Sequence, residues 1–129
     1  MATYHFSKKV AGGFDQTIAR VTEALGKEGF GVLTEIDVGA TLKKKLGVDF
    51  QPYRILGACN PQFAYQALQA EDKIGTMLPC NVVVQQRDDG TVEVSAVDPV
   101  ASMMAIDNPG LGAIATQVRA RLAKVIESL

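Results

Sequence analysis

Two cysteines in similar local settings are the side chains of this chain best suited to chemistry. Cys59 and Cys80 each lie at one end of an apolar run, and an asparagine follows each of them directly. A thiol just before a helix start, as expected at Cys59, can have its thiolate stabilised by free backbone amides and the helix dipole. The pair could then form a thiol relay, a persulfide carrier or a soft-metal site. The alternative is that both are buried small side chains, since free cysteine is among the most buried residue types.

Whether the two thiols can act together depends on the strands that carry them. If the strands expected at about 52–59 and 80–86 are antiparallel neighbours, Cys59 and Cys80 meet at one edge, within range of a disulfide or a shared ligand. If the strands instead run parallel through a crossover helix, a seven-residue strand separates the thiols by roughly 20 Å. In a reducing compartment, two cysteines are more often free thiols than a structural bridge.

Asn60, Asp98 and His5 complete the candidate residues for a ligand or redox site. Asn60 precedes Pro61 and is expected to cap a helix, while Asp98 precedes Pro99 and is expected to shape a turn or cap the next helix. Both could also line a pocket. A lone strand histidine such as His5 is more often solvated or hydrogen-bonded than catalytic.

No metal site and no cofactor is indicated by the pattern. Two cysteines cannot complete a tetrahedral zinc site, so His5 or one of the methionines at 77, 103 and 104 would have to join them. That spacing matches no ligand motif, and no catalytic set is assembled, so whether the protein is an enzyme stays open.

The periodicity of apolar residues predicts an α+β fold. Alternation predicts strands at about 4–10, 30–36, 52–59, 80–86 and 92–96, and helical spacing predicts long helices at 14–25 and 111–129, with shorter ones at 38–46, 61–71 and about 98–103. The turn residues 88–90 favour a hairpin. We therefore expect one domain over residues 1–129, a two-layer sandwich with a largely antiparallel five-stranded sheet and two long helices on one face.

Composition limits the partners. The chain has 129 residues, 47% apolar content and a net charge of -1, with no basic stripe, so nucleic acid is not expected. The lysine run 43–45 fits a solvated helix face. No apolar stretch approaches the ~20 residues that cross a bilayer, and no signal peptide is visible, which predicts a cytoplasmic protein without membrane contact. The second sheet face must meet solvent, a ligand or another subunit, and a homodimer is expected.

A family pattern is carried by residues 53–61, Ala64, Leu68, 78–82, Val84, Asp98, Pro99 and Met103. In these residues the chain resembles the domain-of-unknown-function 302 family. The resemblance covers nearly the whole chain and is specific in its middle third, residues 53–84. It implies a small α+β domain with a curved antiparallel sheet, similar to the TATA-binding-protein-like arrangement, and a homodimer, but no established reaction. Some members carry glycine where this chain has Cys59 and lack the second cysteine, so the two thiols are not a requirement of the fold.

These observations support three functional hypotheses. The first is a small cytosolic homodimeric binding protein with a pocket between sheet and helices, near Cys59 and Cys80. The second is a thiol-based redox, sulfur-handling or soft-metal protein that uses the same two cysteines. The third is a structural interaction module with inert thiols and a partner bound at an exposed patch.

Overall fold

A computed structural model describes residues 3–129 of the chain. The strands are β1 (His5–Val10), β2 (Gly31–Asp37), β3 (Tyr53–Cys59), β4 (Cys80–Gln86) and β5 (Val92–Val97). The helices are α1 (Phe14–Lys27), α2 (Val38–Leu46), α3 (Pro61–Ala70), the 3-10 helix η1 (Asp72–Met77), α4 (Pro99–Ser102) and α5 (Pro109–Glu127). The expected order of elements is confirmed, with η1 as an addition. Within residues 3–129, no helix has both the length and the apolar character needed to cross a membrane.

The five strands form one antiparallel sheet in the order β1-β5-β4-β3-β2. β4 and β5 make the expected hairpin. At its turn, the Asp89 carboxylate accepts hydrogen bonds from the backbone nitrogen and the hydroxyl of Thr91, at 3.0 and 2.7 Å. β1 pairs with β5 and β2 pairs with β3, so β1 and β2 are the two edge strands. The predicted α+β class with an antiparallel five-stranded sheet is confirmed.

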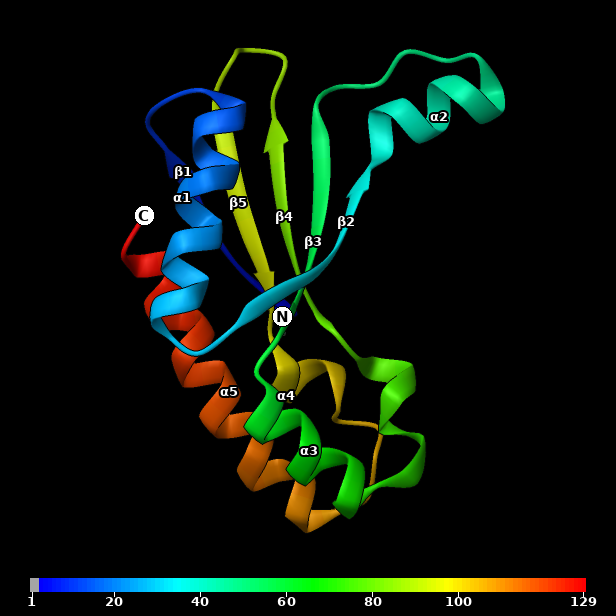
Figure 1. Ribbon diagram of the computed structural model, residues 1–129, viewed down its shortest axis with the longest axis vertical. Coiled ribbons are helices and arrows are strands. Elements are labelled where there is room, and N and C mark those ends of the chain that lie inside the picture. The colour runs from blue at the N-terminus through cyan, green and yellow to red at the C-terminus, as the bar shows by residue number, and fades with distance from the viewer. Residues whose placement is uncertain (1–2) are drawn as a thin grey trace.

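The hydrophobic core lies between the sheet and the two long helices, which cover the same face (Figure 1). Its fully buried members are Val21 and Leu25 of α1, Leu122 and Val125 of α5, and Leu56, Ala58, Val82, Val84, Val92, Val94 and Ala96 of the strands. Burying a side chain of the size of Leu or Val stabilises the fold by about 1.5–3 kcal/mol. The core therefore accounts for the predicted two-layer arrangement.

α5 begins two residues before the helix that the sequence predicts at 111–129. Pro109 is the first residue of α5 and Asn108 is its N-cap. The Asn108 side chain accepts a hydrogen bond from the Gly110 nitrogen at 3.1 Å and donates one to the Ala70 carbonyl at 2.8 Å. The same asparagine thus begins α5 and ties it to the end of α3.

Among residues 3–129, no helix covers the second face of the sheet (Figure 1), and this face carries several polar side chains. His5, Ser7, Asn81, Gln85 and Ser95 lie on this open face, opposite the buried residues of the same strands. The period-two alternation of the strands places them there. The face therefore mixes polar and apolar side chains, with Tyr53 and Val83 among the latter.

Residues 38–52, which we call the arm, stand away from the rest of the molecule (Figure 1). The arm contains α2 and the loop that leads to β3, and α2 has no buried residue. Asp37 caps α2 by accepting a hydrogen bond from the Ala40 nitrogen at 2.9 Å, and Gly47 ends the helix in the left-handed conformation. Local signals are thus sufficient to place the helix, although little of the body packs on it.

Candidate functional site

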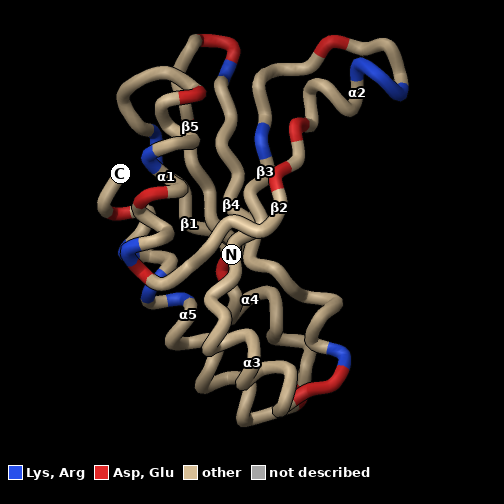
Figure 2. The backbone as a smooth tube through the Cα atoms, viewed as in Figure 1, with Lys and Arg blue, Asp and Glu red and all other residues tan. Residues whose placement is uncertain are grey.

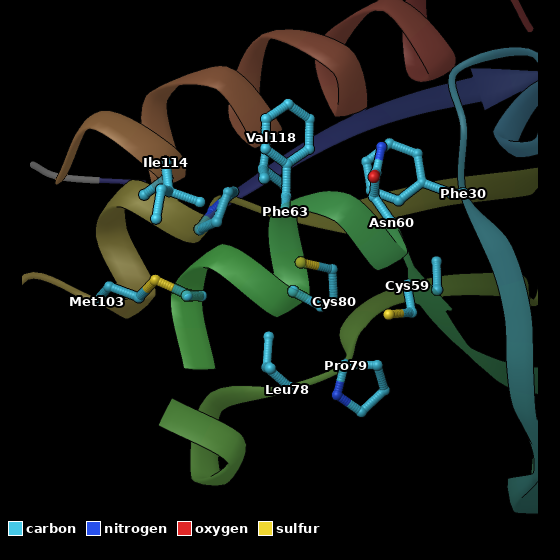
Figure 3. Close-up of a pocket in the computed structure, with 15 residues that line it drawn as sticks. Phe30, Cys59, Asn60, Phe63, Leu78, Pro79, Cys80, Met103, Ile114 and Val118 are labelled. Atoms are coloured by element: carbon cyan, nitrogen blue, oxygen red, sulfur yellow. The ribbon is translucent and has the colours of Figure 1, made fainter. Parts of the chain in front are cut away.

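A narrow apolar cleft brings together three of the five candidate residues. Cys59, Asn60 and Cys80 line it where β3 ends and β4 begins, facing α3, α4 and α5 (Figure 3). The other walls are mainly apolar and include Phe30, Phe63, Pro79, Met103, Ile114 and Val118. Its free volume is only about 30 Å³. That is room for one or two water molecules.

The pairing that the sequence left open is settled by the sheet. β3 and β4 are antiparallel neighbours, so the two thiols lie at the same edge and not at opposite ends of a parallel pair. Cys80 pairs with Ala58, one residue before Cys59. Because successive side chains of a strand alternate in direction, Cys80 points into the core whereas Cys59 is only half-buried. Both cysteines are free thiols, and no disulfide joins them.

Burial controls the chemistry of Cys80. Loss of water around the thiol, with a smaller contribution from the nearby Cys59, raises the pKa of Cys80 from the ordinary value of 9.0 to about 11. At neutral pH, roughly one Cys80 in ten thousand is then a thiolate. Since the thiolate is the nucleophile and the metal ligand, this environment works against a relay that uses both cysteines.

We expect Cys80 to react with thiol reagents only after unfolding and to make stability depend on alkaline pH. Above pH 9 the unfolded chain releases the Cys80 proton, whereas the folded chain keeps it until about pH 11. The free energy of unfolding should therefore fall by about 2 kcal/mol as the pH rises through this range, and the full contribution is present below pH 9. Denaturant titrations at several pH values measure it.

Two variants separate this effect from other groups that titrate at alkaline pH. Cys80→Ala should lack this part of the pH dependence, whereas Cys59→Ser should retain most of it, because burial is the larger cause of the raised pKa of Cys80. The same Cys59→Ser protein leaves Cys80 as the only thiol for labelling. Rapid labelling of native Cys59→Ser protein near neutral pH would contradict the prediction.

Asn60 occupies the predicted N-cap position but does not make the predicted cap. α3 begins at Pro61, as expected, yet the Asn60 side chain makes no hydrogen bond to the first turn. It donates instead to the Glu28 carbonyl at 3.5 Å, where Arg121 also donates at 3.4 Å. The carbonyl at the end of α1 has no partner within its own helix, which explains why side chains from two other elements gather there. Asn60 thus joins α1 to the wall of the cleft.

Asp98 caps a helix and forms an ion pair outside the cleft lining. Its carboxylate accepts hydrogen bonds from the nitrogens of Val100 and Ala101, at 3.0 and 3.4 Å, at the start of α4. Arg119 of α5 donates to the other carboxylate oxygen at 3.2 Å, and its guanidinium lies over the Phe6 ring. The expected capping role is confirmed. Because this carboxylate already accepts hydrogen bonds from three donors, its role is structural.

His5 lies on the open face, on the other side of the sheet from the Cys80 side chain. Its Nδ1 is 2.7 Å from the Ser7 hydroxyl, which is 2.8 Å from the Ser95 hydroxyl. The Tyr4 ring packs edge-on against the imidazole. No carboxylate orients this imidazole among the described residues, so the third member of a Ser-His-carboxylate triad is lacking in this part of the chain.

The open face is hollowed into a groove with a free volume of about 420 Å³. Its floor contains Asn81, Val83 and Gln85 of β4, beside His5 and Ser95. The hydroxyls and amides supply both hydrogen-bond donors and acceptors. Arg87 and Glu93 are the charged residues of the lining. They form an ion pair at 2.6 Å, so their charges cancel. The groove is thus larger and more polar than the cleft between sheet and helices.

A metal site would require further ligands beside the two cysteines. Within residues 3–129, no three or more His, Cys, Asp or Glu side chains gather closely enough to hold a metal ion. His5 and Cys80 are on opposite faces of the sheet, so His5 does not join the two cysteines. Met103 lines the cleft together with Cys59 and Cys80, whereas Met104 is largely exposed.

Comparisons with known proteins agree with this architecture. A family model described as "Domain of unknown function DUF302" matches residues 6–129. The chain belongs to the DUF302 family. A solved structure, an uncharacterized conserved protein DUF302 from Bacillus stearothermophilus, is similar to it, with 37% identity, a TM-score of 0.91 and coverage of 98% of each chain. No curated protein matches the chain.

Most residues that line the groove of this DUF302 protein are not identified by the sequence analysis. Asn81, Gln85 and Ser95 are ordinary polar residues on alternating strands, and none of them stands out by type. The available signal was the period of two, since Asn81, Val83 and Gln85 must face away from Cys80, Val82 and Val84. The convergence of Ser7 with Ser95 needed the β1–β5 pairing, which local patterns do not specify.

Proposed function

We propose that this DUF302 protein is a small binding protein whose ligand site is the groove on the open face of the sheet. The observation that carries the proposal is the size of the groove. Its free volume of about 420 Å³ falls within the range of about 300–1,000 Å³ that is usual for small-molecule sites. The earlier expectation placed the pocket between sheet and helices.

The cleft on the helix side is a weaker candidate because of its volume. An apolar cavity that binds benzene has a volume of about 150 Å³. The cleft offers about 30 Å³, so a ligand could enter only if α3 or α5 moved. The raised pKa of Cys80 also weighs against a thiol-based function that uses both cysteines.

The lining of the groove favours a neutral ligand that has a ring and several polar groups. Tyr4 and Tyr53 offer flat apolar faces, and Asn81, Gln85 and Ser95 offer both donors and acceptors. Arg87 and Glu93 cancel each other, so the groove holds no fixed excess of charge for an ionic ligand.

Mapping by NMR tests the proposed site. We would add phenol, adenosine and glucose separately to the isotopically labelled protein, as neutral ring-containing probes. At least one should shift the side-chain amide signals of Asn81 and Gln85 and the backbone amide of Ser95. Shifts confined to Phe63, Cys80 and Met103, or no shift with any probe, would count against the groove.

We further propose that the protein is a cytoplasmic homodimer. Two unpaired cysteines are typical of a reducing compartment. The support for self-association is the exposed apolar side chains of the arm, because such groups on a projecting segment mark interaction surfaces. Cell fractionation checks the compartment, and light scattering checks the mass.

A further inference from the structure

We infer that the arm is the surface through which two copies of this chain pair, with the lysines of α2 in one copy facing the acidic β4–β5 turn of the other. The arm comprises residues 38–52, and the acidic residues of the turn are Asp88 and Asp89. The inference rests on the proposed homodimer and names its surface.

α2 lacks the packing that a helix of its length needs. An isolated helix shorter than about 12–15 residues is marginal in water, and most helical stability in proteins comes from packing of an apolar face. α2 has nine residues and none is buried. Leu46, Val48 and Phe50 of the arm are 69%, 44% and 49% exposed. A surface that covers these side chains would supply the missing stabilisation.

Segments of opposite charge lie at one end of the molecule. Figure 2 shows the lysine run of α2 and the acidic β4–β5 turn projecting at the same end. Lys43 forms an ion pair with Asp49 at 3.0 Å, which leaves Lys44 and Lys45 for other partners. The bonds from Thr91 hold the pKa of Asp89 below its usual range, so this carboxylate is charged at neutral pH.

A second copy fits these charges better than an anionic membrane or a basic partner does. In a twofold dimer each contact is made twice, because surface i of one subunit meets surface j of the other and the reverse. One chain offers both the basic and the acidic element, which is what such an interface requires. An anionic lipid surface would attract Lys44 and Lys45 but repel Asp88 and Asp89 at the same end.

The arm is also continuous with the groove. The Phe50 and Tyr53 rings lie 6.0 Å apart, and the Gln51 amide donates to the Gln85 side-chain oxygen at 2.9 Å. Tyr53 and Gln85 both line the groove. A partner seated on the arm would therefore lie beside the end of the ligand site, and pairing would restrict access to it.

Light scattering on the full chain tests the inference. The wild type should have a mass of about 28 kDa, twice the 13.8 kDa of one chain. Leu46→Asp together with Phe50→Asp should give a folded monomer, as judged by circular dichroism. The matched control is Tyr65→Asp on α3, which is 65% exposed, lies outside the arm and should stay dimeric.

A charge-swap experiment distinguishes loss of the interface from unfolding of the arm. In a homodimer of the Lys44→Glu, Lys45→Glu variant, the acidic arm of each copy faces the acidic turn of the other. In a homodimer of Asp88→Lys, the new lysine of each turn faces the basic arm of the other copy. Each variant alone should dimerise at least about tenfold more weakly. Mixed together they should form a heterodimer, because both contacts are then between opposite charges.

The outcomes distinguish the proposed homodimer from the surface through which it is proposed to form. A monomeric wild type would overturn the homodimer and this inference together. A dimeric wild type whose arm variants also remain dimeric would overturn the arm alone and leave the homodimer standing. Failure of the two charge variants to restore each other on mixing would overturn the pairing of arm with turn.

Discussion

Replacing Gly57 by alanine is expected to lower the free energy of unfolding by about 3 kcal/mol. Gly57 lies in β3, where the Thr34 hydroxyl and the Pro79 ring close over its backbone. A Cβ added there would clash with the Thr34 Oγ1 and lie 2.8 Å from the Pro79 Cγ. Glycine-to-alanine changes usually stabilise an extended segment by about 0.4–1 kcal/mol, and here the overlap outweighs that gain. Chemical denaturation measures the difference.

Two further variants show whether the overlap is the cause. Gly31→Ala in β2 is the matched control, because an added Cβ there would meet nothing within 4 Å. Its effect should stay within about 0.5 kcal/mol. Thr34→Ala should recover part of the loss in Gly57→Ala, since it removes one of the two overlapping groups. Equal stabilities of Gly57→Ala and Gly31→Ala would contradict the close approach.

Asp98→Ala is expected to cost about 3 kcal/mol of stability. Asp98 is 7% exposed, and its carboxylate accepts from two backbone nitrogens of α4 and from the Arg119 side chain. Alanine leaves the nitrogens of Val100 and Ala101 without their acceptor and removes the link between α4 and α5. Thermal unfolding should show a midpoint lower by roughly 10 °C.

Asparagine at the same position separates the cap from the ion pair. Asp98→Asn keeps an oxygen for the α4 nitrogens but loses the charge that Arg119 requires, so the expected loss is only about 1 kcal/mol. Asp107→Ala is the control, because Asp107 is exposed in the neighbouring loop. If Asp98→Ala were as stable as Asp107→Ala, the structural role of this carboxylate would be wrong.

The elements with strong local signals were predictable from sequence. The strand at 80–86 and the helix at 38–46 agree with β4 and α2 residue for residue. A run of β-branched residues marks the first, and a glycine stop marks the second. η1 was not predicted, because a 3-10 turn of six residues leaves no apolar period to detect.

The candidate site was only partly predictable, because its geometry depends on contacts between distant segments. Asn60 gives its side chain to the Glu28 carbonyl, 32 residues away, instead of to the helix that it precedes. Ser7 and Ser95 meet across 88 residues. Local capping rules and strand periods identify such residues one at a time, but the pairing of strands decides which of them share a surface.

The arm illustrates the same limit for a helix. Its lysine run was interpreted as a solvated face, and all three lysines are exposed in the structure. The apolar side chains of the arm are exposed as well, because the arm extends beyond the part of the protein that could cover them. The periodicity of a short helix does not show whether another part of the same chain packs against it.

The most direct test of the proposed site compares how a neutral ring-containing probe binds to two variants. One variant has a filled groove and the other has a filled cleft. Val83→Arg places a long side chain on the floor of the groove, and Ala67→Leu fills the cleft from α3. Both proteins must first show native circular dichroism. We expect the NMR shifts caused by phenol, adenosine or glucose to vanish in Val83→Arg and to persist in Ala67→Leu. Loss of the shifts in Ala67→Leu alone would contradict the account and place the ligand between the sheet and the helices.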